Sequence, residues 1–293
     1  MAWRRLVVVV LAVLVVCGGL WAVPPTRNAL SRLALGVRPG VTLGGTPVGG
    51  MYRGEVRALL VAMAKTTERA PVNAGVDRKT GQITPDRDGS ALDIPVTLER
   101  VMRAGIRARI EPVYAPVPPR WTVQDILAMT YVAGRYTTWG YGGSERWHNL
   151  GLALRSINNT LLYPGQTFSF MDAMPPFTAK SGWQSAPVIL DGEMEPGLGG
   201  GVCQVSSTLY NAARRAGMKI VERHRHAKPV HYVPPGCDAT VAARPLLDLR
   251  FQNVLDRPVL IRAALDGGAV RTVLYTLPPT TAPDKAATGP SAA

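Results

Sequence analysis

The sequence predicts an α+β protein with an N-terminal transmembrane helix, a small α+β domain and a larger α+β domain. In the larger domain a helix starting at Cys203 is expected to pack on an antiparallel sheet. A charge-free apolar run opens the chain, several segments carry apolar residues at helical spacing, and the pattern changes to strands after residue 219. With 293 residues, of which 46% are hydrophobic and 18% charged, the chain has enough apolar material for one large or two ordinary domains.

Residues 1–24 are expected to be a membrane anchor or a signal segment. Arg4 and Arg5 precede residues 6–23, which contain no charge, amide or hydroxyl and approach the ~18 residues of a membrane-spanning helix. The two arginines place the N-terminus in the cytoplasm and the body outside. The alternative is a cleaved signal peptide, because Leu-Trp-Ala at 20–22 approximates a small-x-small cleavage site. We therefore expect a single-pass protein of the cell membrane with an extracytoplasmic body, or a secreted protein.

Composition and periodicity divide the rest of the chain. Residues 25–47 are rich in glycine, arginine and proline and are expected to be a linker, and residues 113–121 form a stiff proline-rich connector. Residues 278–293 are mostly proline, alanine and threonine, which predicts a disordered tail. The two predicted domains occupy residues 48–112 and 122–277.

Each domain has a predicted order of elements. In the small domain the pattern predicts a helix, two short strands separated by turns, and a second helix, over residues 53–64, 72–84, 91–96 and 97–104. In the larger domain we expect helices over residues 122–133, 146–162 and 202–216. A hairpin is predicted around Asp266-Gly267-Gly268, with arms at residues 259–265 and 270–275.

The charge distribution limits the classes of partner. Lysine and arginine number 33 and acidic residues 20, a net charge of +13 that is spread along the chain. A diffuse basic surface suits anionic lipids or wall polymers, and without a basic run beside aromatics we expect no nucleic-acid partner. The sequence also lacks a phosphate loop and a dinucleotide fingerprint, so we expect no nucleotide and no cofactor.

Cys203 is the first candidate for chemistry. It follows three glycines at 199–201 and opens a predicted helix, where unpaired N–H groups and the helix dipole would lower the pKa of its thiol. The glycines would let a substrate backbone approach closely. Two alternatives are open: Cys203 is a small buried hydrophobe in a tight turn, or it forms a disulfide with Cys237.

The histidines cluster after the cysteine. On a strand, His224 and His226 would share a face, and a return strand through His231 toward Asp238 would bring an imidazole and a carboxylate to the thiol. Cysteine, histidine and aspartate then occur in the order found in cysteine peptidases. Alternatively, the histidines lie on a solvated basic strand. A zinc site with Cys237 is a third reading, but no pair has the usual ligand spacing, and we expect no metal.

Four motifs resemble the VanW family in order, spacing and residue type. They are PGQTFSF at 164–170, GGGVCQVSSTLYN at 199–211, ERHRH at 222–226 and YVPPGCDATV at 232–241. The resemblance covers roughly residues 135–265, and PVNA at 71–74 with GQI at 81–83 is similar to the peptidoglycan-binding domain that often precedes VanW domains. The resemblance implies a bacterial cell-envelope setting linked to glycopeptide resistance. It also marks Cys203, His226 and Asp238 as family-type positions, whereas Cys237 departs from the family pattern.

Two functions follow as hypotheses. In the first, the protein is a cysteine-dependent enzyme acting on amide bonds of peptidoglycan stem peptides, with Cys203 as nucleophile, His226 as base and Asp238 orienting the base. In the second, it is a non-catalytic peptidoglycan-binding or accessory module. In either case peptidoglycan or its peptide stems are the expected partner, and the expected substrate-binding residues are Gly200, Gly201, Gln204, Ser206, His224 and Tyr232.

Overall fold

A computed structural model describes residues 31–190 and 193–279, which form two compact units. Of the described residues, unit 1 comprises residues 31–72 and Asp88–Pro118, and unit 2 comprises Asn73–Arg87, residues 119–190 and residues 193–279. The predicted transmembrane helix and nearly all of the predicted tail lie outside the described residues. Within residues 31–190 and 193–279, no helix is both long and apolar enough to cross a bilayer. The described residues have a mixed α+β fold with several sheets.

Unit 1 is a small α+β body. Its sheets have the strand orders β2-β1-β6, in which β1 runs parallel to β6, and β5-β7. In chain order its elements are β1 (Thr42–Leu43), β2 (Thr46–Pro47), α3 (Arg53–Thr67), β5 (Gly89–Leu92), α4 (Ile94–Met102), β6 (Arg109–Ile110) and β7 (Tyr114–Val117).

Part of the predicted linker at residues 25–47 belongs to the core of unit 1. Val37, Val41 and Leu43 are buried with Val56 and Leu60 of α3, because the glycine-rich turns fold this segment back on the helix. The linker prediction is therefore wrong for this part of the segment.

Helix α3 forms where the apolar spacing predicts it, whereas α4 begins earlier than predicted. The Asp93 side chain accepts a hydrogen bond from the Val96 N–H, and Pro95 stands in the first turn. Both features favour a helix start, so the predicted strand over 91–96 ends at Leu92.

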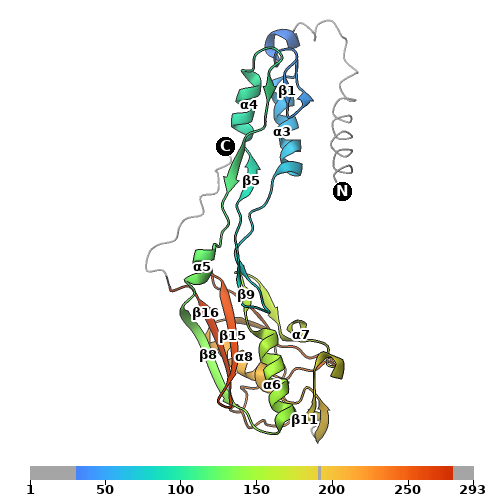
Figure 1. Cartoon of the computed structure of the whole chain (residues 1–293), viewed down its shortest axis with the longest axis vertical. Coiled ribbons are helices and arrows are strands. Elements are labelled where there is room, and N and C mark those ends of the chain that lie inside the picture. The colour runs from blue at the N-terminus through green and yellow to red at the C-terminus, as the bar shows by residue number, and fades with distance from the viewer. Residues whose placement is uncertain (1–30, 191–192, 280–293) are drawn as a thin grey trace. The chain divides into compact units, whose positions relative to one another are not determined.

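Unit 2 is built on a four-stranded antiparallel sheet with the strand order β8-β16-β15-β9 (Figure 1). Smaller sheets have the orders β10-β14-β13, β11-β12 and β3-β4. The helices and strands of unit 2, in chain order, are β3 (Gly75–Val76), β4 (Ile83–Thr84), α5 (Val123–Leu127), β8 (Tyr131–Trp139), α6 (Ser144–Ile157), β9 (Thr160–Leu162), β10 (Thr167–Ser169), α7 (Phe170–Ala173), η1 (Ala179–Ser181), β11 (Ser185–Leu190), β12 (Glu193–Leu198), α8 (Val202–Arg215), β13 (Lys219–Glu222), β14 (Arg250–Gln252), β15 (Val259–Asp266) and β16 (Ala269–Thr276).

Helices α6 and α8 pack against each other and against this sheet. Leu150 and Leu154 of α6 meet Val205 and Leu209 of α8 in one core, and all four side chains are fully or almost fully buried. Strand β8 approaches α8 closely, because a Cβ at Gly134 would overlap the backbone of the helix. The predicted helix at Cys203 on an antiparallel sheet is thus present, and it is the central element of unit 2.

Three predicted elements of unit 2 differ from the structure. The helix over 122–133 ends at Leu127, and Tyr131 already begins β8, which pairs with the last strand of the sheet. The helix over 146–162 ends at Ile157, since Asn159 has a positive φ of 60° and turns the chain into β9. The segment Asn73–Arg87, expected in the small domain, belongs to unit 2.

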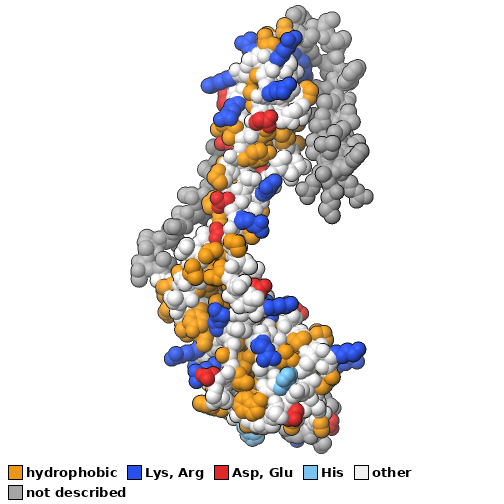
Figure 2. All heavy atoms as spheres, viewed as in Figure 1, with side chains coloured by type: hydrophobic (Ala, Val, Ile, Leu, Met, Phe, Trp, Pro, Cys, Tyr) orange, Lys and Arg blue, Asp and Glu red, His pale blue; other side chains and the backbone are white. Residues whose placement is uncertain are grey.

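The surface carries its positive charge in a scattered form. Figure 2 shows lysine and arginine side chains distributed over the visible face of both units, with apolar side chains between them. This agrees with the even distribution of basic residues along the sequence.

Candidate functional site

The glycines before Cys203 adopt conformations that other residues rarely adopt. Gly201 caps α8 with φ +111°, and Gly199 has φ +82°. Gly200 lies against the backbone of Ala186 and Pro187, where a Cβ would come within 2.7 Å of three backbone atoms. The turn therefore requires glycine for its backbone shape and for its close contact with β11.

A cleft of about 880 Å³ opens at this end of α8. Its lining includes polar and reactive side chains, among them those of Arg146, Cys203, His226, His231 and Tyr232. Two of the three predicted catalytic residues, Cys203 and His226, therefore face the same space.

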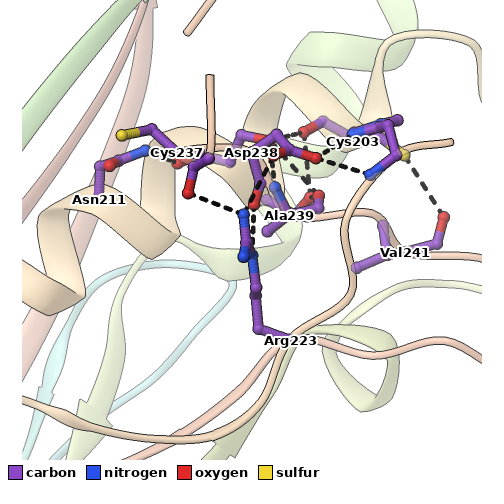
Figure 3. A network of polar contacts seen from close by, with 11 residues as sticks. Cys203, Asn211, Arg223, Cys237, Asp238, Ala239 and Val241 are labelled. Atoms are coloured by element: carbon purple, nitrogen blue, oxygen red, sulfur yellow. Dashed lines mark hydrogen bonds and ion pairs between the residues drawn. The ribbon is translucent and has the colours of Figure 1, made fainter. Parts of the chain in front are cut away.

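The surroundings of the Cys203 thiol favour its protonated form. Its Sγ lies 3.4 Å from the Val241 carbonyl oxygen, to which it donates a hydrogen bond (Figure 3). Burial raises the pKa of this thiol above its ordinary value. This direction is opposite to the one expected from the helix N-terminus, and burial is its largest cause.

His226 and Asp238 form a hydrogen-bonded pair, as a base and its orienting acid require. Oδ2 of Asp238 lies 2.7 Å from Nδ1 of His226 and accepts a second bond, also of 2.7 Å, from the His226 backbone N–H. Burial raises the pKa of the Asp238 carboxyl, but the hydrogen bonds from His226 outweigh it and the pKa lies below its usual value. With Nδ1 occupied, the Nε2 atom of His226 is the ring nitrogen left for proton transfer.

Arg223 fixes the other side of Asp238. Its Nη2 lies 3.0 Å from Oδ1 of the carboxylate, its Nε donates to the Asp238 carbonyl at 2.6 Å, and its Nη2 also donates to the Gly236 carbonyl (Figure 3). The guanidinium stacks over the Tyr210 ring at 5.0 Å. Asp238 is therefore held in place from both sides, and its hydrogen bonds in turn hold the His226 ring.

The thiol and the imidazole share the cleft without a hydrogen bond between them. Among the described residues, the one hydrogen bond of the Cys203 side chain goes to Val241. Cys203 and Cys237 are both free, and their sulfur atoms lie at opposite ends of the network in Figure 3. The described residues also contain no group of three or more histidine, cysteine, aspartate or glutamate side chains that could hold a metal. Neither the disulfide nor the zinc alternative is supported.

Polar side chains of α8 tie the helix to the loop that carries Asp238. Ser206 donates to the Ala239 carbonyl at 2.6 Å, Ser207 accepts from the Ala239 N–H at 2.8 Å, and Asn211 donates to the Cys237 carbonyl at 2.6 Å. Ser206 is fully buried and contributes to this connection, whereas we expected it to bind substrate.

The other predicted substrate-binding residues fall into two groups. Gly201, Gln204 and Tyr232 line the cleft, and burial raises the pKa of the Tyr232 hydroxyl. The structure describes Gly200 and His224, but neither residue lines the cleft.

His224 lies outside the cleft because the chain leaves the strand before it. Strand β13 ends at Glu222, and the Nε2 atom of His224 pairs with Glu222 Oε1 at 2.9 Å. His224 forms an isolated antiparallel bridge with Thr240, outside β13, and His226 and His231 follow it in a loop.

Arg146 is a residue of the cleft that the sequence reasoning missed. It occupies the first turn of α6, on the same face as Asn149, Leu150 and Ala153, and it is 8% exposed. A basic residue at the same helical spacing as the buried residues of α6 is the sequence signal that would have identified it.

The fold and the site together define a class of protein. It is an α+β domain in which a cysteine at the start of a buried helix and a histidine–aspartate pair from a following loop meet at one cleft. The family model described as "VanW like protein" matches residues 145–275, which contain all of these groups. The chain belongs to the VanW family.

Two curated relatives support this membership. The chain is 38% identical over 214 residues to the uncharacterized protein YoaR of Bacillus subtilis (strain 168), across 71% of this chain and 70% of that protein. It is 28% identical over 123 residues to the vancomycin B-type resistance protein VanW of Enterococcus faecalis (strain ATCC 700802 / V583), across 40% of this chain and 44% of that protein. No solved structure matches the chain.

Proposed function

We propose that this protein is a bacterial cell-envelope enzyme that uses Cys203 to act on amide bonds of peptidoglycan stem peptides. The observation that carries the proposal is the His226–Asp238 pair at the cleft that Cys203 also lines. The similarity to a vancomycin resistance protein supports an envelope setting, because vancomycin resistance concerns the cell wall.

The chemistry follows from the roles of the three side chains. Nε2 of His226 takes the proton of the Cys203 thiol, and the thiolate attacks the amide carbonyl. The C–N bond breaks, the departing amine takes the proton from His226, and the acyl group remains on Cys203 as a thioester. Water or a second amine then attacks the thioester, gives its proton to His226 and releases the thiol. Asp238 keeps the ring in the required orientation throughout.

The resting thiol has to leave the Val241 carbonyl before it reacts. Its raised pKa and this hydrogen bond both favour the protonated form, so the thiolate forms only when a bound substrate brings the thiol and His226 together. Catalytic hydrogen bonds of this kind often tighten only in the substrate complex.

A comparison of two histidines tests the proposal. Purified protein is incubated with a synthetic stem pentapeptide, and mass spectrometry follows the products and a thioester on Cys203. We expect Cys203→Ala to abolish turnover and His226→Gln to lower it by about a hundredfold or more. His224→Gln is the matched control, since its imidazole pairs with Glu222 outside the cleft, and it should retain activity within about threefold. Full turnover by Cys203→Ala would refute the enzymatic function.

A non-catalytic peptidoglycan-binding or accessory module is the second candidate. Burial, which favours the neutral form of the Cys203 thiol, supports this candidate, because a binding module needs no nucleophile. In this case Cys203→Ala would bind isolated peptidoglycan as well as the unmodified protein does and would restore the phenotype of a deletion strain. If the protein is an enzyme, Cys203→Ala should still bind peptidoglycan but should not restore the phenotype of the deletion strain.

A further inference from the structure

Arg146 is a buried cation without a counter-ion. It is 8% exposed, and no aspartate or glutamate pairs with it among the described residues. Its one hydrogen bond runs from Nη2 to Gln204 Oε1 at 2.9 Å, and its buried Nε has no partner. Burying a charge without compensation is costly, so an arginine in this state needs an acceptor that the described chain does not supply.

The surroundings of Arg146 increase the positive potential. Arg146 stands in the first turn of α6, and a Cβ at Gly201, which caps α8, would lie 3.2 Å from its side chain. The positive ends of two helices therefore meet a guanidinium. Lys228 also lines the cleft, and none of the described lining residues is acidic.

The guanidinium is held in a fixed orientation toward this site. Its carbon lies 4.6 Å from the centre of the Tyr141 ring, and Gln204, which orients Nη2, is itself fixed by bonds to Thr138 and Trp139. A rigid guanidinium at the edge of a cleft presents its remaining donors in the planar arrangement that matches a carboxylate.

From these observations we infer that Arg146 binds a carboxylate of the ligand that occupies the Cys203 cleft. The inference rests on the proposed function for the identity of the ligand, a peptide with a free carboxylate. We assign a carboxylate because the planar donors of a guanidinium match its two oxygen atoms. Arg146 is then a specificity-determining residue rather than a catalytic one.

Binding to full-length Cys203→Ala protein tests the inference without turnover. The probe is an N-acetylated peptide ending in D-alanyl-D-alanine, compared by calorimetry with the same peptide ending in a carboxamide. We expect the carboxylate form to bind about tenfold to a hundredfold more tightly, as a charge-assisted hydrogen bond predicts. Introducing Arg146→Gln into the Cys203→Ala protein should remove this difference in affinity. Introducing Arg146→Lys instead should retain only part of it.

Arg155→Gln is the matched control, because it makes the same change on the exposed side of α6 and should keep the preference for the carboxylate. Equal binding of the two peptides to the protein with Arg146 intact would overturn the inference even if an Arg146 variant fails to fold. Competition by inorganic phosphate at concentrations where acetate has no effect would overturn it in favour of a phosphate site. If the Cys203 and His226 tests succeed and this one fails, the enzyme stands without a carboxylate site.

Discussion

At the scale of single residues, Cys203 illustrates two opposing effects on one thiol. The start of a helix favours a thiolate, whereas burial favours the neutral thiol and raises its pKa. His226 and Asp238 are already in the orientation that a base needs. The site therefore combines a hydrogen-bonded His226–Asp238 pair with a thiol whose pKa is raised.

The pH dependence of alkylation measures this balance. Only the thiolate reacts with iodoacetamide, so a raised pKa shifts the reaction of Cys203 to higher pH. We expect a midpoint above that of a cysteine model peptide and, at pH 7, a rate lower by about tenfold or more. Peptide mapping distinguishes Cys203 from the other cysteines.

Urea-unfolded protein is the control, and its Cys203 should return to the midpoint of the model peptide. A midpoint at or below the reference value in the folded protein would mean that the helix N-terminus and His226 outweigh burial. The thiol would then be activated before substrate binds.

At the scale of elements, the glycine turn connects β12 to the start of α8 and packs against β11. Gly200 has no room for a side chain, and Gly199 and Gly201 have positive φ angles. The turn thereby sets the position of the Cys203 backbone relative to the cleft.

Gly200→Ala should separate the turn from β11. Its Cβ would meet backbone atoms of Ala186 and Pro187, which cannot rotate away, so we expect a loss of about 2–3 kcal/mol in the free energy of unfolding. Gly151→Ala is the control, because this glycine lies inside α6 and its Cβ would meet only the flexible end of Arg155. It should be neutral or stabilising by up to about 1 kcal/mol. Urea denaturation checks both values, and equal stabilities would show that the turn yields to a side chain.

Elements with a strong local pattern were predictable from the sequence. Helix α8, helix α3 and the β15–β16 hairpin form close to the predicted residues, since apolar spacing and the Gly267-Gly268 turn determine them locally. Strand β8 was not predictable in this way. It forms because β16, from the far end of unit 2, pairs with it, and this partner overrides the helical spacing that residues 122–133 share.

The candidate site was predictable in part for a similar reason. Cys203 could be identified from the glycines and the helix start, and His226 and Asp238 from their order in the chain. Which histidine pairs with Asp238 depends on the path of a loop, and sequence spacing does not fix that path. Arg146 could have been identified as a cation on the apolar face of α6, but its place in the cleft depends on the contact between the starts of α6 and α8.

At the scale of the whole molecule, unit 2 is discontinuous in sequence. Ala74 from the segment Asn73–Arg87 is buried with Ile126, Met129 and Leu260. The chain leaves unit 2 at Arg87, forms part of unit 1 and returns at Pro119. Unit boundaries that follow composition alone therefore assign this segment to the wrong unit.

The apolar run at residues 6–23 yields a prediction about location. We expect the full chain to sediment with membranes, and we expect protease added to intact protoplasts to digest it. The positive-inside rule predicts that the body lies outside the cytoplasm, where the protease can reach it. A variant that starts at residue 25 should stay in the cytoplasm. Fractionation with immunoblotting checks both, and a change in mass of the mature protein identifies cleavage. Full-length protein in the cytoplasmic fraction would contradict the prediction.

The pairing of β8 with β16 also determines when unit 2 is complete. Strand β8 lies near the start of the sheet's sequence, yet its hydrogen-bonding partner is the last strand of the chain that the structure describes. During synthesis or translocation, β8 must wait with an open backbone edge until residue 276 has emerged. A stalled or proteolytically shortened product would keep that edge open and tend to associate with other chains.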